Sequence, residues 1–235
     1  MSTSISKKRA ALEALKHVKS GMVVGLGTGS TSAFFIEALG EAIKRGELSV
    51  KGVPTSYQAF QKAVKCGVPI ITIEEASCID LAVDGADEVE VGTLNLIKGR
   101  GAALTREKIV DSMAKEFIVI VDDRKIVNKL GVKTPIPVEV LPFGYAYVLK
   151  KLKELGCEPT LRSAGTYKDG PLITDNGNFI IDAKFNGIEN PRELELTIKS
   201  IPGVIEVGIF TGLVKLVYVG YEDRVITLTP QTRKG

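Results

Sequence analysis

Residues 84–107 read DGADEVEVGTLNLIKGRGAALTRE, and the rest of the sequence is organised around this stretch. The apolar residues Ile79, Leu81, Ala82 and Val83 come directly before it, so Asp84 stands where a buried strand ends, and strand ends are where open α/β sheets bind ligands. An Asp-Gly pair alone is more typical of a simple turn. Here Lys98, a glycine-rich loop and Glu107 follow it. Carboxylates and a lysine around a glycine turn suit proton transfer on a small anionic substrate.

Composition describes an ordinary globular protein. The chain has 235 residues, of which 44% are hydrophobic and 25% charged, enough for one large or two small domains. The net charge of +3 is too small and too dispersed to indicate binding to nucleic acid or to a membrane surface. No apolar run approaches the ~18 residues of a transmembrane helix, and the first residues lack the apolar core of a secretion signal. We therefore expect a cytoplasmic protein without nucleic-acid or membrane partners.

The scarcity of histidine and cysteine restricts the chemistry. Cys66, Cys78 and Cys157 are odd in number and widely spaced, so they suggest neither a disulfide framework nor a metal-ligand pattern. His17 is the one histidine and lies in a predicted surface helix, which argues against a Ser-His-Asp triad and a multi-histidine metal site. We expect no bound metal, and acid–base chemistry must use carboxylates, lysine or tyrosine.

A glycine-rich loop lies at the end of the first predicted strand. The segment 22–31, MVVGLGTGST, leads from a short apolar strand into a helix at 32–45. This geometry holds phosphate on backbone N–H groups and a helix N-terminus. The loop lacks the GK[ST] of a P-loop, and Ser30 replaces the third glycine of a dinucleotide fingerprint, so ATP and NAD are disfavoured. The hydroxyls of Thr28 and Thr31 suit a phosphate or a hydroxylated ligand, although they equally suit a helix cap.

Strands and helices alternate through the first half of the chain. Strands are predicted at 22–24, 50–55, 70–73, 79–83 and 117–121, and helices at 4–19, 32–45, 56–65 and 102–114. The run FIVIV at 117–121 is wholly apolar, as expected of a central parallel strand that is covered on both faces. We therefore predict an α/β fold with a doubly wound, mostly parallel, Rossmann-like sheet.

The pattern changes near Gly131. Strand and helix signals then follow in the order β-α-β-β-α-β, at 136–140, 145–155, 159–162, 179–183, 191–200 and 204–209. This order is that of the ferredoxin-like unit. An Asn-Gly pair at 176–177 marks the turn of its central hairpin.

The remaining strands suggest how the chain divides into domains. Strands predicted at 214–219 and 225–228 would return to the first sheet. We predict an α/β catalytic domain at 1–130 and 210–235, with a second, smaller ferredoxin-like α+β domain inserted at 131–209.

Four motifs follow one another along the chain. They are GLGTGST at 25–31, DGADEV at 84–89, KGRGAALTREK at 98–108 and VDDRK at 121–125. Together they resemble the ribose-5-phosphate isomerase A family. The later IPVEVLP at 136–142 and the ferredoxin-like pattern are also similar to that family, so the resemblance covers nearly the whole chain. One departure is Arg100, which stands where the family motif usually has a glycine.

The resemblance implies an aldose–ketose isomerase that interconverts D-ribose 5-phosphate and D-ribulose 5-phosphate in the non-oxidative pentose phosphate pathway. It implies neither a metal nor an organic cofactor, and it implies a homodimer or homotetramer. Glu107 is implied as the general base, with Asp84 and Lys98 as further catalytic groups. The implied substrate contacts are Thr28, Gly29, Ser30, Thr31, Asp84, Gly85, Ala86, Asp87, Lys98, Gly99, Arg100, Gly101 and Lys125.

The chemistry of these residue types fits the implied reaction. Isomerisation moves a proton between adjacent carbons through an enediolate, and one carboxylate, Glu107, can remove and return it. Lys98 and neighbouring backbone amides can stabilise the negative oxygen, each such donor typically contributing about 3 kcal/mol. Asp84 can carry a hydroxyl proton, Asp87 can orient sugar hydroxyls, and Lys125 can bind the phosphate. The helix dipole alone would also favour a glutamate in a first turn.

Two other functions stay open at this point. One is a different sugar-phosphate enzyme on a similar fold, such as an amino-sugar phosphate deaminase or a lactonase, which would be expected to use a histidine. The other is a non-catalytic sugar-phosphate-sensing module of a regulator, which would predict an attached DNA-binding helix-turn-helix. The sequence has one poorly placed histidine, His17, and no strongly basic helix pair. The isomerase is therefore the function that the sequence favours.

Overall fold

The FIVIV run lies at the centre of the largest sheet. The computed structural model describes residues 2–166 and 168–231. In spatial order the strands of this sheet are β14 (Val225–Leu228), β13 (Leu216–Gly220), β6 (Ala114–Asp122), β3 (Ile79–Asp84), β1 (Val23–Leu26) and β2 (Lys51–Pro54). Every pairing among them is parallel except that of the edge strand β14 with β13. The mostly parallel, Rossmann-like sheet predicted from the sequence is confirmed.

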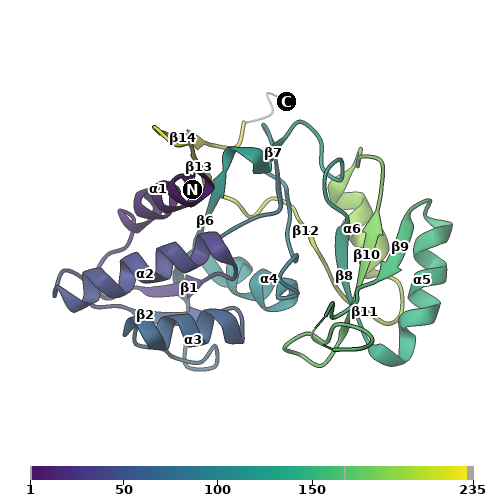
Figure 1. Cartoon of the computed structure of the whole chain (residues 1–235), viewed down its shortest axis with the longest axis horizontal. Helices are drawn as coiled ribbons and strands as arrows, with labels where there is room; N and C mark the ends of the chain where they lie inside the picture. The colour runs from purple at the N-terminus through teal and green to yellow at the C-terminus, as the bar shows by residue number, and fades with distance from the viewer. Residues whose placement is uncertain (1, 167, 232–235) are drawn as a thin grey trace.

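Helices cover both faces of this sheet. They are α1 (Ser2–Leu15), α2 (Ser30–Lys44), α3 (Tyr57–Cys66) and α4 (Leu104–Met113). The first three gather on one face, at the left of Figure 1, whereas α4 packs on the other face, between the sheet and the second unit. The start of α3 shows why a helix begins there, because the Ser56 side chain accepts the Ala59 N–H in an N-cap.

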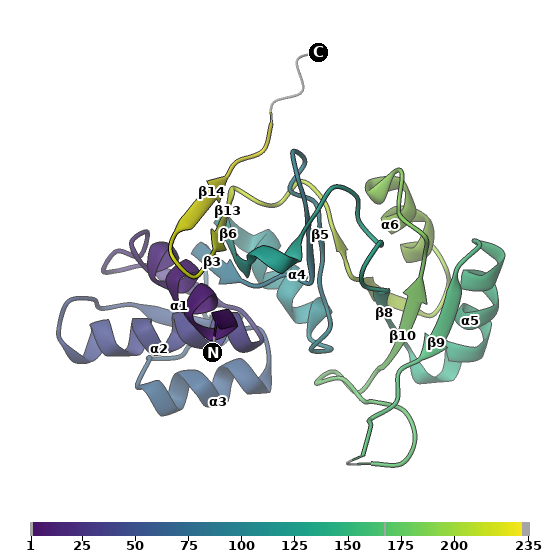
Figure 2. The same ribbon diagram turned by 45° about the horizontal axis from the view of Figure 1, so that its top comes forward.

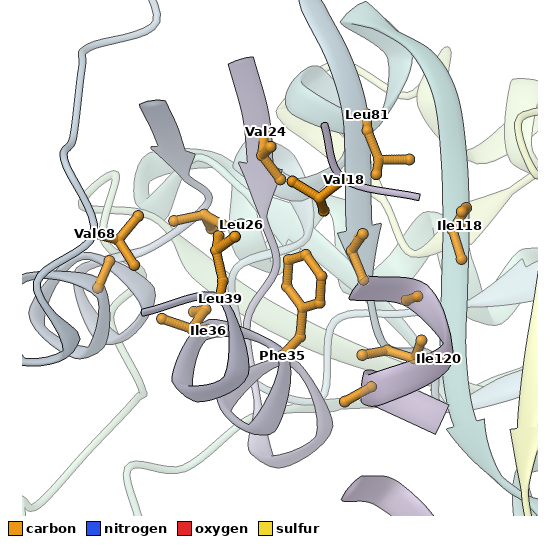
Figure 3. Packing of buried hydrophobic residues seen from close by; sticks show 14 of the residues in the cluster. Val18, Val24, Leu26, Phe35, Ile36, Leu39, Val68, Leu81, Ile118 and Ile120 are labelled. Carbon is orange, nitrogen blue, oxygen red and sulfur yellow. The ribbon is translucent and has the colours of Figure 1, made fainter. Parts of the chain in front are cut away.

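The side chains of β6 explain its unbroken apolar sequence. Ile118 and Ile120 point into the core shared with the first three helices, where Phe35 of α2 lies in the middle of the cluster (Figure 3). Phe117 and Val119 point to the opposite face and join a second core. Because both faces of this strand are buried, every side chain along it is removed from water, and each position therefore favours a hydrophobic residue.

The second unit is a four-stranded antiparallel sheet backed by two helices, at the right of Figures 1 and 2. Its elements are β8 (Ile136–Val140), α5 (Tyr145–Glu154), β9 (Glu158–Leu161), β10 (Phe179–Lys184), α6 (Pro191–Lys199) and β11 (Val204–Val207). The strand order β11-β8-β10-β9 is the ferredoxin-like arrangement. Leu152 and Ile198 of the helices pack on Val138 and Ile181 of the sheet. The predicted ferredoxin-like unit is confirmed.

A third, small sheet joins the two units, and the sequence did not predict it. Its strands are β12 (Ile209–Phe210), β5 (Leu96–Ile97), β4 (Glu88–Glu90) and β7 (Ile126–Val127), and two 3₁₀ turns are η1 (Asp123–Lys125) and η2 (Pro142–Gly144). Strands of two or three residues carry too short an alternating pattern to be recognised in a sequence. β12 follows the last strand of the second unit, and the Lys98 N–H donates to the Gly208 carbonyl beside it at 2.9 Å. A Cβ on Gly208 would lie 2.3 Å from the Lys98 carbonyl oxygen, so only glycine fits there.

The first helix is shorter than predicted. The helix expected at 4–19 ends at Leu15, and the Val18 N–H then donates to the Leu15 carbonyl in a tighter turn that still buries Val18. His17 therefore lies beyond the helix, and its Nε2 is 2.7 Å from the Tyr218 hydroxyl.

The strand predicted at 70–73 is also wrong, because among the described residues this segment forms a single bridge, between Gly52 and Ile70. The Glu75 side chain accepts the Thr72 N–H at 2.8 Å, and this local bond ends the pairing. In the described part of the chain, no helix is long and apolar enough to cross a bilayer.

Candidate active site

The carboxyl ends of the central strands surround a pocket of about 460 Å³. It is lined by Lys7, Thr28, Gly29, Ser30, Thr31, Gly85, Ala86, Asp87, Lys98, Gly99, Arg100, Gly101, Glu107, Arg124 and Lys125. Every residue predicted for the site is in this lining except Asp84, which lies beneath it. The structure therefore brings together segments that are about a hundred positions apart in the sequence.

Asp84 is a fully buried anchor under the pocket. Its Oδ1 accepts from the Thr28 N–H at 3.0 Å, the Ser32 hydroxyl at 3.0 Å and the Gly85 N–H at 2.7 Å. A Cβ on Gly27 would stand only 2.0 Å from this oxygen, so the glycine-rich loop can approach the carboxylate only because it has no side chain there. The loop after β1 and the end of β3 are thus held together by one carboxylate.

Lys98 lies between two carboxylates. Its Nζ is 2.8 Å from Oδ2 of Asp84 and 3.6 Å from Oε2 of Glu107, and it donates to the Gly85 carbonyl at 2.7 Å. Burial by itself lowers the pKa of Lys98, but Asp84, Glu107 and Asp111 outweigh this effect and raise the pKa above its ordinary value. Lys98 is therefore a charged, fixed hydrogen-bond donor at neutral pH.

Glu107 is almost fully buried, with 5% of its surface exposed, yet it lines the pocket. It lies in the first turn of α4, and its N–H donates to the Ala103 carbonyl. Burial, and then the negative charges of Asp84 and Asp87, raise the pKa of Glu107 to about 8 against the opposing effect of Lys98. Within the described residues its Oε2 accepts no hydrogen bond. A carboxylate in this environment is a candidate general base near neutral pH.

Asp87 fixes the second glycine-rich loop of the pocket, residues 98–101. Its Oδ2 accepts the Arg100 N–H at 2.9 Å, and its Oδ1 lies 3.8 Å from the Lys125 ammonium. Gly99 adopts a φ of 109°, a conformation that side chains rarely take, so glycine is required at that position. Arg100, the residue that departs from the family motif, lines the pocket with its backbone anchored.

One end of the pocket is cationic, and the sequence analysis missed two of its residues. Lys7 donates to the Ser30 hydroxyl at 2.9 Å, and Arg124 lies beside Lys125 in the lining. Partial burial lowers the pKa of Lys7, Asp122 opposes this effect, and the cations Arg124, Lys125 and Arg100 lower it further. The VDDRK motif already contained Arg124, whereas only the packing of α1 brings Lys7 to the loop after β1.

The same cationic end faces the start of α2. Ser30 is the first residue of this helix, and Gly29 precedes it without a side-chain cap. The first N–H groups of a helix have no partner within the helix, and together with the helix dipole they favour an anion. A phosphate is the group that this end of the pocket suits best.

Asp111 is a further buried acid that the sequence did not single out. It lies one helical turn after Glu107 with 2% of its surface exposed. Within the described residues neither of its carboxylate oxygens has a hydrogen-bond partner. Burial raises the pKa of Asp111 well above its ordinary value, with Lys98 opposing and Asp84 and Glu107 adding to the rise. Residues 2–166 and 168–231 hold no group of three or more His, Cys, Asp or Glu side chains arranged for a metal ion.

Comparison with known proteins identifies the family. The sequence profile of ribose 5-phosphate isomerase A (phosphoriboisomerase A) matches residues 51–224. The chain belongs to this family. The ribose-5-phosphate isomerase A of Pyrococcus abyssi is 53% identical over 223 residues, which are 94% of this chain and 96% of that protein. That of Thermosynechococcus vestitus is 52% identical over 229 residues, covering 97% and 95% of the two chains.

Solved structures of ribose-5-phosphate isomerases have the same fold. The Methanocaldococcus jannaschii enzyme superposes with a TM-score of 0.91 at 53% identity, covering 95% of this chain and 97% of that one. A D-ribose-5-phosphate isomerase in complex with phospho-erythronic acid superposes with a TM-score of 0.95 at 52% identity, covering 97% and 100%. The predicted membership of the ribose-5-phosphate isomerase A family, and with it the aldose–ketose isomerase activity, is confirmed.

Proposed function

We propose that Glu107 is the general base with which this isomerase interconverts D-ribose 5-phosphate and D-ribulose 5-phosphate. One observation carries the proposal: a buried carboxylate lines the pocket with its Oε2 3.6 Å from the ammonium of Lys98. A base and a fixed cation in a pocket that is also lined by Lys7, Arg124 and Lys125 match an enediolate that carries a phosphate.

The substrate phosphate binds at the start of α2. Lys7, Lys125 and the N–H groups of Ser30 and Thr31 supply positive charge and donors there. The ligand of the solved relative, phospho-erythronic acid, carries a phosphate and a carboxylate on a hydroxylated chain. Both groups of such a molecule find a counterpart in this pocket, the phosphate at the cationic end and the carboxylate at Lys98.

The carbon-bound proton moves through Glu107. The carboxylate removes the proton from C2 of the open-chain aldose, the C–H electrons form the C1–C2 double bond, and the carbonyl oxygen on C1 becomes negative. Lys98 and the amides of the 98–101 loop stabilise that oxygen, a kind of contact worth about 3 kcal/mol for each donor. Protonated Glu107 then returns the proton to C1, while the hydroxyl proton on O2 is transferred to the negative oxygen on C1, so that the carbonyl forms at C2 and a hydroxyl at C1.

Asp84 acts through Lys98. Asp84 was predicted to carry a hydroxyl proton, but it lies beneath the pocket and both of its oxygens already face donors. We assign it first to holding Lys98 charged and in place. Transfer of the hydroxyl proton by Asp84, relayed past Lys98, stays a prediction that an Asp84→Asn variant tests. The Asp84→Asn side chain retains the shape of the carboxylate and lacks its charge.

A coupled assay on ribose 5-phosphate tests the role of Glu107. We expect Glu107→Gln to fold normally and to lose most turnover, while the matched control Glu116→Gln, an exposed glutamate of β6, keeps wild-type activity. A chelator should leave the wild-type rate unchanged. Near-normal kcat in Glu107→Gln would refute the assignment, and loss of activity with chelator would refute a metal-free mechanism.

We further propose that the protein is a cytoplasmic homodimer or homotetramer whose residues 131–209 form a domain inserted into the catalytic one. The exposed apolar side chains of Leu141, Phe143 and Tyr147 support self-association, since Phe143 is 97% exposed. The separate core around Val138 supports the domain division. Sedimentation velocity tests the assembly, and a monomer at micromolar concentration would contradict it.

A further inference from the structure

Arg162 connects the second unit to the glycine-rich loop 98–101 of the pocket. It follows β9, and its side chain is 16% exposed. Its Nη1 donates to the Gly99 carbonyl at 3.0 Å and to the Arg100 carbonyl at 3.1 Å. Its Nε and Nη2 donate to the two carboxylate oxygens of Asp182, at 2.8 and 2.5 Å. Arg162 does not line the pocket, so any effect on the reaction must pass through the loop.

The bidentate pair with Asp182 determines where the remaining donor points. A guanidinium is planar and presents its N–H groups in a fixed fork. When two of them bind the Asp182 carboxylate, the plane is fixed and Nη1 is directed at the loop. Because the positive charge of Arg162 is already paired with Asp182, its contribution at the pocket is a matter of geometry more than of charge.

Two successive peptide groups of the loop are held in this way. The peptide between Gly99 and Arg100 is fixed on both sides, because its carbonyl accepts from Arg162 and its N–H donates to Asp87. The next peptide has its carbonyl on Arg162, and in a planar trans peptide the N–H points the opposite way. That N–H belongs to Gly101, which lines the pocket.

The Gly101 N–H is free to meet a substrate. It has no hydrogen-bond partner in the described part of the chain, and the position of its absent Cβ lies 3.4 Å from Cγ2 of Thr28, another residue of the lining. Glycines on both sides of Arg100 make this loop permissive of other backbone conformations. Within the loop, the Ala102 N–H donates to the Gly99 carbonyl at 3.0 Å and closes a turn. The bonds from Arg162 and to Asp87 add to this turn and help to fix the direction of the loop N–H groups.

We propose that Arg162 is a positioning residue for the isomerisation: by holding the Gly99 and Arg100 carbonyls, it turns the Gly101 N–H into the pocket as a donor to the developing enediolate oxygen. This inference rests on the proposed function. A misplacement of about 1 Å in a group that stabilises a transition state can reduce the rate ~100-fold, so a residue outside the pocket can strongly affect turnover.

Arg162→Lys in the full-length protein tests the proposal. A lysine keeps the charge opposite Asp182 but cannot bind this carboxylate in a fork and both carbonyls at once. We expect kcat to fall roughly 10- to 100-fold while KM changes less than about threefold, because the lost interaction forms in the transition state. Arg192→Lys, an exposed arginine of α6, is the matched control and should keep wild-type kcat.

Chemical rescue separates positioning from general damage to the fold. Added guanidinium at millimolar concentration should raise the kcat of Arg162→Ala and leave Arg162→Lys and the wild type unchanged. Asp182→Asn, which weakens the fork but keeps its shape, should lower kcat in the same direction by less. Thermal unfolding of each variant measures the structural effect independently.

The outcomes are decisive in both directions. Wild-type kcat in Arg162→Lys, or a fall in kcat that follows the loss of thermal stability and is not rescued by guanidinium, would overturn the proposal. If Glu107→Gln retained turnover, the proposed function itself would fail. The inference fails alone if Glu107→Gln is inactive and Arg162→Lys is fully active.

Discussion

The ammonium of Lys98 lies 3.6 Å from Oε2 of Glu107, and both side chains are almost completely buried. Asp84 lies on the other side of the same ammonium, at 2.8 Å. One cation thus serves two carboxylates away from water, where each charge depends on the others. Three of the predictions below follow from this arrangement.

Removing the cation should damage both activity and stability. Lys98→Met leaves Asp84 and Glu107 without their partner, and breaking a buried ion pair from one side typically destabilises by about 3–5 kcal/mol. We expect kcat to fall roughly 10²- to 10³-fold through loss of the donor to the enediolate. Urea unfolding and the coupled assay measure the two effects. In the double variant with Asp84→Asn, stability should partly return and activity should not, and recovery of both would contradict this account.

The pH dependence of kcat/KM should report Glu107 in the free enzyme. Because burial with Asp84 and Asp87 raises the pKa of Glu107 to about 8, the base is largely protonated at pH 6 and ionised at pH 9. We expect kcat/KM to rise with pH and to level off above about 8. A profile that is flat from pH 7 to pH 9, a range above the second pKa of about 6 of the substrate phosphate, would rule out this assignment.

Stability should change with pH in the opposite sense. Between the ordinary pKa of 4.5 and about 8, the folded protein holds a proton on Glu107 that the unfolded chain has released. The contribution of this group to stability is therefore fully present below pH 4.5 and is lost as pH rises through about 8. Glu107→Gln should flatten this part of the curve of unfolding free energy against pH. An unchanged slope would show that Glu107 is ionised throughout.

Asp111 should reduce stability at high pH. Its raised pKa means that the folded state favours the protonated acid, so stability declines once the unfolded chain ionises. Asp111→Asn removes the titration and keeps the shape, and we expect it to raise the free energy of unfolding more at pH 8.5 than at pH 5. Urea unfolding at both values measures this. A destabilised variant at pH 8.5 would mean that Asp111 is a needed charge.

Lys7 should govern substrate affinity more than turnover. Its ammonium lies beside Ser30 at the cationic end of the pocket, far in sequence from Asp84 and Glu107. Lys7→Ala should raise KM roughly tenfold with a smaller change in kcat, because the phosphate is bound alike in the ground and transition states. Lys8→Ala, an exposed neighbour on the same helix, is the matched control. Equal effects of the two substitutions would remove Lys7 from the phosphate site.

Much of this architecture could be read from the sequence because its signals are local. The FIVIV run and the glycine loop between strand and helix carry their own hydrophobic and backbone patterns, and both lie where the patterns predict. The small sheet around β5 was missed because its strands have two or three residues each. Lys7 was missed because a lysine on a helix is ordinarily solvated, and only the packing of α1 brings it to Ser30, 23 positions away. Arg162 and Asp111 carry no local signal at all.

The bond from the Lys98 N–H to the Gly208 carbonyl has a consequence for how sugar enters and leaves. At that point the chain that returns from the ferredoxin-like unit is hydrogen-bonded to the backbone of Lys98. The space there is too small for any side chain on Gly208. A hinge motion between the two units would have to break this bond or move the Lys98 backbone. We therefore expect the sugar to enter and leave through movements of side chains and short loops at the rim of the pocket.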